Sequence, residues 1–370
     1  MFDLIIRDAQ TIDHKKMDIA IKDGKIVKIE SQIKDSAVNE YHLEEGAFIS
    51  AGWIDDHVHC FEEMSLYYDY PDEIGYKQGV TTVIDAGTTG AENIHRFYDL
   101  AKEATTNVYA LVNISKWGIV AQDELADLSK IKFDLVAQAL RTCPDFIVGL
   151  KARMSKTVIG ENGIKPLVLA KEIQNANQSL PLMVHIGSAP PSLETILAHM
   201  EQGDVLTHCF NGKENGILNQ ENQSIKSFVF DAYHKGIAFD IGHGTDSFNF
   251  DVAEHALAAG IKASSISSDI YIRNRTNGPV YDLATTMEKL AVIGYDWKEI
   301  IEKVTAAPAA QFRLNNKGKI AVGYDADLTI FSFKEEDKVL TDSNGNTRTT
   351  SVQIIPTIAV IGGELFETND

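Results

Sequence analysis

Short apolar runs alternate with helix-like stretches through most of this chain, and this alternation constrains the fold more than any other feature. Eight runs have the length and composition of buried strands: residues 53–59, 81–86, 108–115, 146–151, 182–187, 205–208, 237–241 and 263–269. Continuous apolar strands separated by helices are typical of a parallel sheet that is buried on both faces. Eight such units over about 250 residues predict an α/β fold with a (β/α)8 TIM barrel. An open doubly wound sheet, the alternative, calls for a glycine-rich turn after its first strand, where this chain has histidines.

Both ends of the chain carry short alternating runs instead. Residues 1–50 contain several strand-like runs, and residues 307–370 contain a hairpin signal at Asn344-Gly345. Neither end is long enough to build a good core alone. We therefore predict one small composite β-sandwich domain made from both ends, with the barrel at 51–306. Two separate β-appendages are the alternative.

The charge of the chain limits its partners. It has 34 Lys and Arg against 53 Asp and Glu, which gives a net charge of −19. Nucleic acids and anionic membrane surfaces bind clustered basic residues, so we expect neither as a partner. A small acidic substrate is compatible, because a metal and one or two arginines in a cleft can reverse the local field. The sequence shows no signal-peptide pattern and no apolar run of membrane-spanning length, so we expect a cytoplasmic location. We also expect a homo-oligomer.

Metal-ligating residue types recur at the carboxyl ends of the predicted strands, where barrel enzymes place their catalytic groups. His57 and His59 stand one residue apart on the first strand, so their side chains point to the same face. The fourth, fifth, sixth and eighth strands end in Lys151, His185, His208 and Asp269. Each has an ordinary explanation alone, such as a buried histidine or a helix cap. Their recurrence on five strands indicates a metal site.

These six residues exceed the needs of one catalytic zinc, which takes three protein ligands and a water. The surplus predicts two metal ions about 3.5–4 Å apart that share a bridging hydroxide. Nitrogen and oxygen donors suit Zn²⁺ best, and Mn, Co and Fe are alternatives. Lys151 does not fit this set as an ammonium, which has no lone pair. It must be neutral or converted into an anion.

With these residues, the chain resembles the amidohydrolase superfamily, in its binuclear subtype, over nearly its whole length. The resemblance rests on Asp55-x-His57-x-His59, on the later residues in their expected order, and on the C-terminal segment GYDADL at 323–328. It implies that CO₂ carboxylates Lys151 and that this carbamate bridges both metals. It also implies that one metal is held by His57, His59 and Asp269, and the other by His185 and His208.

Within the superfamily, the chain looks most like deacetylase-type enzymes that were often labelled dihydroorotase or adenine deaminase. The segments that carry this similarity are GLKARMS at 149–155, HIG at 185–187, THCFNG at 207–212 and DIGHG at 240–244. The chain departs from dihydroorotase at Phe61. That family has an arginine there, which binds the substrate carboxylate.

We therefore predict a binuclear zinc hydrolase that removes an acyl group, with acetyl expected, from a small acidic ester or N-acyl amino-acid-like compound. The bridging hydroxide would be the nucleophile, and Asp269 the general base or, alternatively, a ligand only. Arg153 is predicted to bind a substrate carboxylate or oxyanion, with a salt bridge at the barrel rim as the alternative. His243, at the end of the seventh strand, is predicted to contact the substrate, with a hydrogen bond inside its loop as the alternative.

Three other functions compete with this prediction. A cyclic amidase, such as a dihydroorotase or hydantoinase, and an aminohydrolase of the adenine-deaminase type would use the same site. A metal-free scaffold protein belongs to a different class and would lack ligands, whereas all six are present here.

Overall fold

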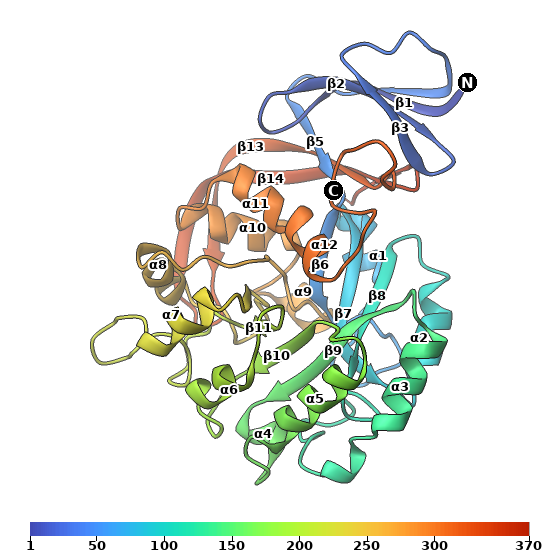
Figure 1. Ribbon diagram of the computed structural model, residues 1–370. Helices are drawn as coiled ribbons and strands as arrows, with labels where there is room; N and C mark the ends of the chain where they lie inside the picture. Colours follow the sequence, from blue (N-terminus) through green and yellow to red (C-terminus); the bar gives the residue numbers. More distant parts are fainter. Residues whose placement is uncertain (370) are drawn as a thin grey trace.

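Parallel strands form a curled sheet at the centre of the computed structural model, which describes residues 1–369 (Figure 1). The strands pair in sequence order, β12-β11-β10-β9-β8-β7-β6. Their bounds are β6 (Trp53–Val58), β7 (Val80–Gly90), β8 (Asn107–Asn113), β9 (Ile147–Met154), β10 (Leu182–Ile186), β11 (Val205–Thr207) and β12 (Ala238–Asp240). All carboxyl ends therefore lie at one end of the sheet, as a barrel active site requires.

The predicted eighth strand, residues 263–269, is not a regular strand, yet it closes the barrel. Ser265 forms a single parallel bridge to Asp240 at the end of β12. On the other side, the amide of Asp269 donates to the carbonyl oxygen of His57 in β6 at 2.7 Å. Asp269 has a φ of 49°, a left-handed conformation that regular strands do not contain. The segment joins the first and last strands, and the predicted barrel is confirmed.

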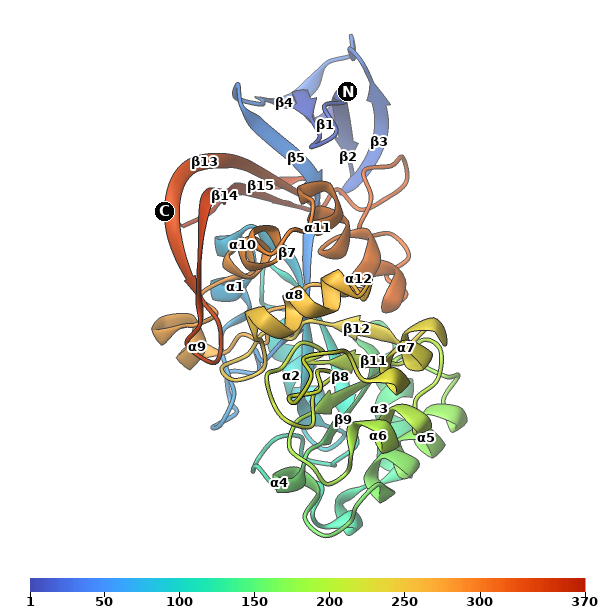
Figure 2. The same cartoon turned by 90° about the vertical axis from the view of Figure 1, so that its left-hand side faces the viewer.

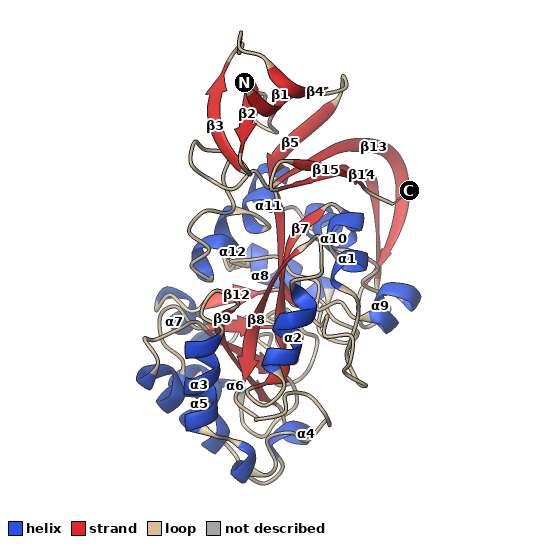
Figure 3. Ribbon diagram, turned by 90° about the vertical axis from the view of Figure 1, so that its right-hand side faces the viewer, coloured by secondary structure: helices blue, strands red, loops and turns tan. Residues whose placement is uncertain are grey.

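Helices follow the strands, and most of them cover the outer face of the sheet (Figure 3), whereas α12 (Ala306–Gln311) contributes Ala309 to the inner-face cluster. The helices are α1 (Pro71–Ile74), α2 (Ile94–Ala101), α3 (Phe133–Thr142), α4 (Lys156–Ile159), α5 (Lys165–Ala176), α6 (Leu193–His199), α7 (Ser227–His234), α8 (Phe250–Ala258), α9 (Ile272–Asn277), α10 (Leu283–Val292), α11 (Trp297–Lys303) and α12. The large hydrophobic core lies between these helices and the sheet. A second apolar cluster, which includes Ile54, Leu111 and Met183, fills the opposite, inner face. Among residues 1–369, no helix combines the length and apolarity that crossing a membrane requires.

Strands from both ends of the chain share one core beside the barrel. The first sheet has the order β3-β2-β1-β4 and contains β1 (Phe2–Gln10), β2 (Lys16–Lys22), β3 (Lys25–Glu30) and β4 (Ala37–His42). The second has the order β15-β14-β13-β5 and contains β5 (Ala47–Ala51), β13 (Leu328–Thr341), β14 (Thr347–Ile361) and β15 (Glu364–Glu367). One hydrophobic cluster combines Ile6 and Ile19 of the first sheet with Leu328 and Val360 of the second. Where the domains begin and end along the chain stays a prediction.

The long β13–β14 hairpin curves away from this β-core and along the side of the barrel (Figure 2). At its tip, Asp342 accepts a hydrogen bond of 3.0 Å from the amide of Phe250, the first residue of α8. Ser343 donates to the carbonyl oxygen of Gly244, in the loop after β12, at 3.1 Å. The C-terminal hairpin therefore supports a loop at the carboxyl end of the barrel.

Candidate active site

A cavity of about 310 Å³ lies at the carboxyl ends of the barrel strands. All six residues predicted to bind metal line it: His57, His59, Lys151, His185, His208 and Asp269. Arg153 lines it as well, and His243 does not. The structure therefore brings together seven of the eight residues that the sequence singled out.

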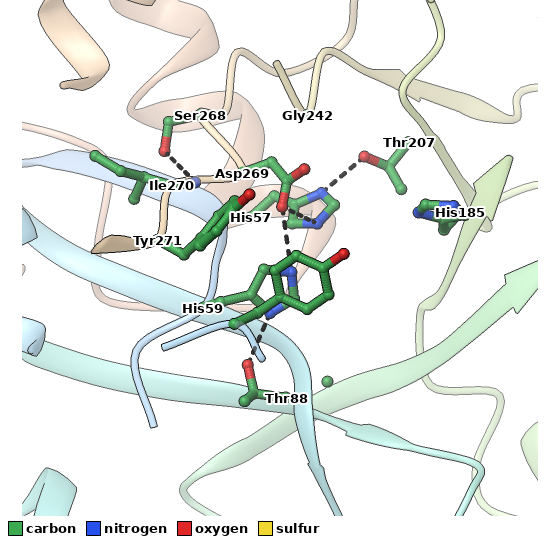
Figure 4. A network of polar contacts seen from close by, with 12 residues as sticks. His57, His59, Thr88, His185, Thr207, Gly242, Ser268, Asp269, Ile270 and Tyr271 are labelled. Carbon is green, nitrogen blue, oxygen red and sulfur yellow. Dashed lines mark hydrogen bonds and ion pairs between the residues drawn. The ribbon is translucent and has the colours of Figure 1, made fainter. Parts of the chain in front are cut away.

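The first group of candidate ligands is His57, His59 and Asp269. Their donor atoms lie within 4.8 Å of one another, close enough to share one metal ion. Oδ1 of Asp269 is 3.4 Å from Nε2 of His57 and 3.2 Å from Nε2 of His59 (Figure 4). His57 lies near the end of β6 and His59 directly follows that strand, whereas Asp269 comes from the closing segment. The barrel closure itself therefore assembles this group.

The second group is His185, at the end of β10, and His208, just after β11. Nε2 of His208 lies 2.8 Å from Nδ1 of His185. Nδ1 of His208 donates to the carbonyl oxygen of Gly242 at 2.6 Å, so Nε2 carries the lone pair of the neutral ring. His208 has a φ of 66°, the left-handed region again, where the chain turns at the strand end.

The ring nitrogens of both groups are suited to binding cations. Burial lowers the pKa of His208 to about 4, and it lowers the pKa values of His57 and His185 well below their ordinary value. Neutral imidazoles have a free lone pair, which is the form that coordinates metal. Buried lone pairs that converge on one polar cavity fit a metal centre. The donor set of nitrogens and one carboxylate matches the preference of zinc.

Lys151 lies at the floor of the same cavity and is buried. Its Nζ is 3.1 Å from Nε2 of His57. Burial lowers the pKa of Lys151 to about 7, so the neutral amine is populated near neutral pH. The nucleophilic neutral amine is the form that reacts with CO₂. The position and environment of Lys151 therefore fit a bridging carbamate.

Arg153 forms part of the cavity wall. Its Nη1 lies 3.2 Å from a carboxylate oxygen of Glu124, and its Nη2 donates to Gln122 at 3.1 Å. The guanidinium also lies 5.9 Å from the ring of Tyr67. Burial raises the pKa of Glu124 to about 7, while Arg153 opposes that shift. Arg153 thus has the predicted salt bridge and also faces the cavity, so anion binding by Arg153 stays a prediction.

His243 is placed differently from the expectation that it contacts the substrate. Its ring is completely buried and stacks on Phe248 at 4.8 Å. Nδ1 donates to the carbonyl oxygen of Gly244 at 2.9 Å, and Nε2 accepts from Lys289 at 2.8 Å. Because both ring nitrogens are bonded away from the cavity, the structure favours the alternative, a residue that stabilises its own loop.

Several site residues were not identified from the sequence. Tyr67, Gln122 and Glu124 line or support the cavity from the loops after β6 and β8, where no periodic pattern marks them. The hydroxyl partners of two candidate ligand histidines, Thr88 and Thr207, were also missed. Long loops after barrel strands are the only sequence signal for the first set, because such loops carry specificity on this fold.

Comparison with known proteins shows the family to which the chain belongs. A family model described as a deacetylase-like composite domain matches residues 320–367. A deacetylase of Enterococcus faecalis is 67% identical over 366 residues, which cover 99% of each chain. A crystal structure named as an adenine deaminase is 67% identical, covers 100% of both chains and gives a TM-score of 0.99. A second crystal structure, named as a dihydroorotase, is 34% identical and gives a TM-score of 0.91. The match covers 99% of this chain and 98% of that chain. The chain therefore belongs to the deacetylase family of the amidohydrolase superfamily and is a hydrolase.

Proposed function

We propose that the protein is a two-metal hydrolase that removes an acyl group, with acetyl expected, from a small acidic ester or N-acyl amino-acid-like compound. The observation that carries this proposal is the convergence of six metal-ligating side chains and one arginine on a single cavity. The first group would hold one zinc ion and the second group the other. A carbamate formed from Lys151 and CO₂ would bridge them.

When bound, two such metals supply an activated water and polarise the carbonyl group of the substrate. Asp269 is the residue of this chain that can move the proton. Its Oδ1 faces both histidines of the first group, which leaves Oδ2 as the atom that accepts a proton. Asp269 is also the more exposed partner in these contacts, with 16% of its side chain accessible. It can therefore pass the proton to the leaving group.

Arg153 is the residue that selects an acidic substrate. Glu124 and Gln122 hold its guanidinium in one orientation, so less freedom is lost when an anion binds. These two contacts use only part of the five N–H donors of an arginine. The remaining donors can bind a carboxylate at the cavity wall. The small cavity volume favours a small molecule.

A screen for the released product tests this proposal. Acetylated amino acids and acetylated hydroxy acids, both enantiomers, are incubated with the protein in the presence of zinc and bicarbonate. We expect acetate to appear with at least one acidic compound. The related structure named as an adenine deaminase raises a second candidate, in which ammonia is released from a purine. Ammonia from adenine without acetate from any acyl compound would contradict the proposal.

The role of Arg153 is tested with a substrate pair. The best acidic substrate is compared with its carboxamide in the wild type and in Arg153→Met. We expect the substitution to raise KM for the acid about 10- to 100-fold, because a charge-assisted hydrogen bond is lost. KM for the carboxamide should change little. An equal change for both compounds would show that Arg153 supports the wall and does not select the charge.

A further inference from the structure

Each histidine of the first group is held from behind by a threonine, and each threonine is held by an aspartate. Nδ1 of His59 lies 2.7 Å from Oγ1 of Thr88 (Figure 4), and that hydroxyl donates to Oδ2 of Asp85 at 2.7 Å. We call this arrangement a His–Thr–Asp chain. It lies on the side of the ring opposite to the cavity.

A second His–Thr–Asp chain starts at the other histidine. Nδ1 of His57 lies 2.8 Å from Oγ1 of Thr207, which donates to Oδ2 of Asp240 at 2.6 Å. The two chains share no residue, and their threonines and aspartates come from different strands: β7 for the first chain, β11 and β12 for the second. Their four threonine and aspartate side chains are completely buried, so water does not compete for these bonds.

The direction of each hydrogen bond follows from the aspartates. Oxygens of Asp85 accept from the amides of Cys60 at 2.9 Å and Thr88 at 2.8 Å, and an oxygen of Asp240 accepts from the hydroxyl of Ser267 at 2.7 Å. Carboxylates that accept several bonds act as acceptors for the threonine hydroxyl too. Each threonine hydroxyl therefore donates its single proton to the aspartate, and its oxygen accepts a hydrogen bond from the imidazole N–H.

This order places the proton of each imidazole on Nδ1. The lone pair is then on Nε2, and in both rings Nε2 is the atom that faces Asp269. A histidine that must first change tautomer or rotate binds metal less well. The threonine hydroxyls thus prepare both rings for a metal before one arrives.

We propose that Thr88 with Asp85, and Thr207 with Asp240, are positioning residues that fix the tautomer and orientation of His59 and His57 for metal capture. The metal-affinity part of this inference rests on the proposed two-metal function. The tautomer part does not, because the hydrogen bonds are complete without a metal.

The test replaces each threonine by valine, which has the same shape and no hydroxyl group. Thr88→Ser and Thr207→Ser restore the hydroxyl, and Thr89→Val is a matched control. Thr89 is the next residue, is completely buried, and its hydroxyl has no hydrogen-bond partner within residues 1–369. Thr88→Ala and Thr207→Ala provide hydroxyl-free variants if a valine variant does not fold.

Two measurements are made on each variant. Nitrogen-15 spectra of histidine-labelled, metal-free protein report the tautomer, and competition with a chelator reports zinc affinity. We expect Thr88→Val to change the tautomer signal of His59 alone and Thr207→Val that of His57 alone. Zinc affinity should fall about 10- to 100-fold in each. The zinc affinity of the serine variants and of Thr89→Val should stay within about threefold of the wild-type value.

The outcomes separate the two claims. A wild-type protein that binds no zinc contradicts the proposed function, while the tautomer spectra still test the chains. A wild type that binds zinc, together with valine or alanine variants of unchanged tautomer and affinity, overturns the inference. Serine variants that lose as much affinity as the valine variants would overturn it as well, because packing and not the hydroxyl would then be responsible.

Discussion

The two groups of candidate ligands in the cavity are held by the protein in different ways. In the first group, His57 and His59 are each fixed through a buried hydroxyl and a buried carboxylate. In the second group, His208 bonds directly to a backbone carbonyl, that of Gly242. Within residues 1–369, the ring of His185 has one hydrogen-bond partner, the ring of His208. The first group is preset by side chains, whereas the second relies on one backbone carbonyl and on the contact between its two rings.

This difference indicates a division of work. A preset group loses little freedom when it binds an ion, so we expect it to retain metal more firmly. The second group lies beside Arg153, whose β9 position pairs in register with His185 of β10. It is therefore closest to the wall proposed to bind the substrate. Four predictions test whether the two halves differ in this way.

The largest effect is expected for Lys151→Ala, which should remove the carbamate proposed to bridge the two groups. Nζ of Lys151 lies 3.1 Å from His57, and no other candidate ligand can form a carbamate. We expect loss of both metals and a fall in kcat/KM of about 10³-fold or more. Metal analysis and kinetics on the same preparation measure this. Partial recovery with short carboxylic acids would support the bridge, whereas a fully active variant would refute it.

Gly242→Ala should disturb both halves together. Gly242 has a φ of 47°, and an added Cβ would lie 2.3 Å from Oγ1 of Thr207 and 2.8 Å from Nδ1 of His208. Displaced ligands should lower kcat about 100-fold. Gly203→Ala is the control, since its φ is also positive at 90° but an added Cβ meets nothing within 4 Å. If both variants behave alike, backbone strain and not ligand contact is responsible.

Replacing one histidine from each half compares their support directly. His59→Ala removes a buried ring and leaves the hydroxyl of Thr88 without its donor. We expect it to lower the free energy of unfolding of the metal-free protein by about 2–4 kcal/mol. His185 is less buried than His59, so His185→Ala should cost less than about 1 kcal/mol. Urea denaturation measures both, and equal losses would show that the halves are supported alike.

The smallest effect is the pH dependence of stability that Glu124 causes in the cavity wall beside the second group. Burial raises the pKa of Glu124 from its ordinary 4.5 to about 7. Between these values the folded protein holds a proton that the unfolded chain has released, so stability falls as pH rises. From pH 5 to 7 we expect the wild type to lose about 1–2 kcal/mol more than Glu124→Gln. Urea denaturation at both pH values measures this. An equal change in the free energy of unfolding for the two proteins would contradict the prediction.

The barrel and its strand ends could be predicted because periodicity carries that information. His57, Lys151 and His208 stand at the ends of apolar runs, and the fold fixes where such ends lie. The eighth strand was only partly predictable. Its apolar pattern indicates a strand, but the left-handed backbone at Asp269 is set by the barrel closure and leaves no mark in the sequence.

The residues around the candidate ligands could not be predicted, for physical reasons that differ from case to case. Glu124 lies on a loop and reaches Arg153 only through the course of that loop. Thr88 meets His59 because β6 and β7 are neighbours whose pairing shifts register between Asp55 and Val58. A threonine near a strand end is common. Only the three-dimensional register shows which one faces a histidine.

The closing contact between Asp269 and His57 also has a consequence for how the protein is made. The first group takes two donors from the first barrel strand and one from the segment that completes the circle. A nascent chain still emerging from the ribosome carries the histidines long before Asp269 is synthesised. An ion that requires all three donors can bind only to a chain whose barrel is complete. Completed molecules would thus bind this metal, and chains truncated before Asp269 would not.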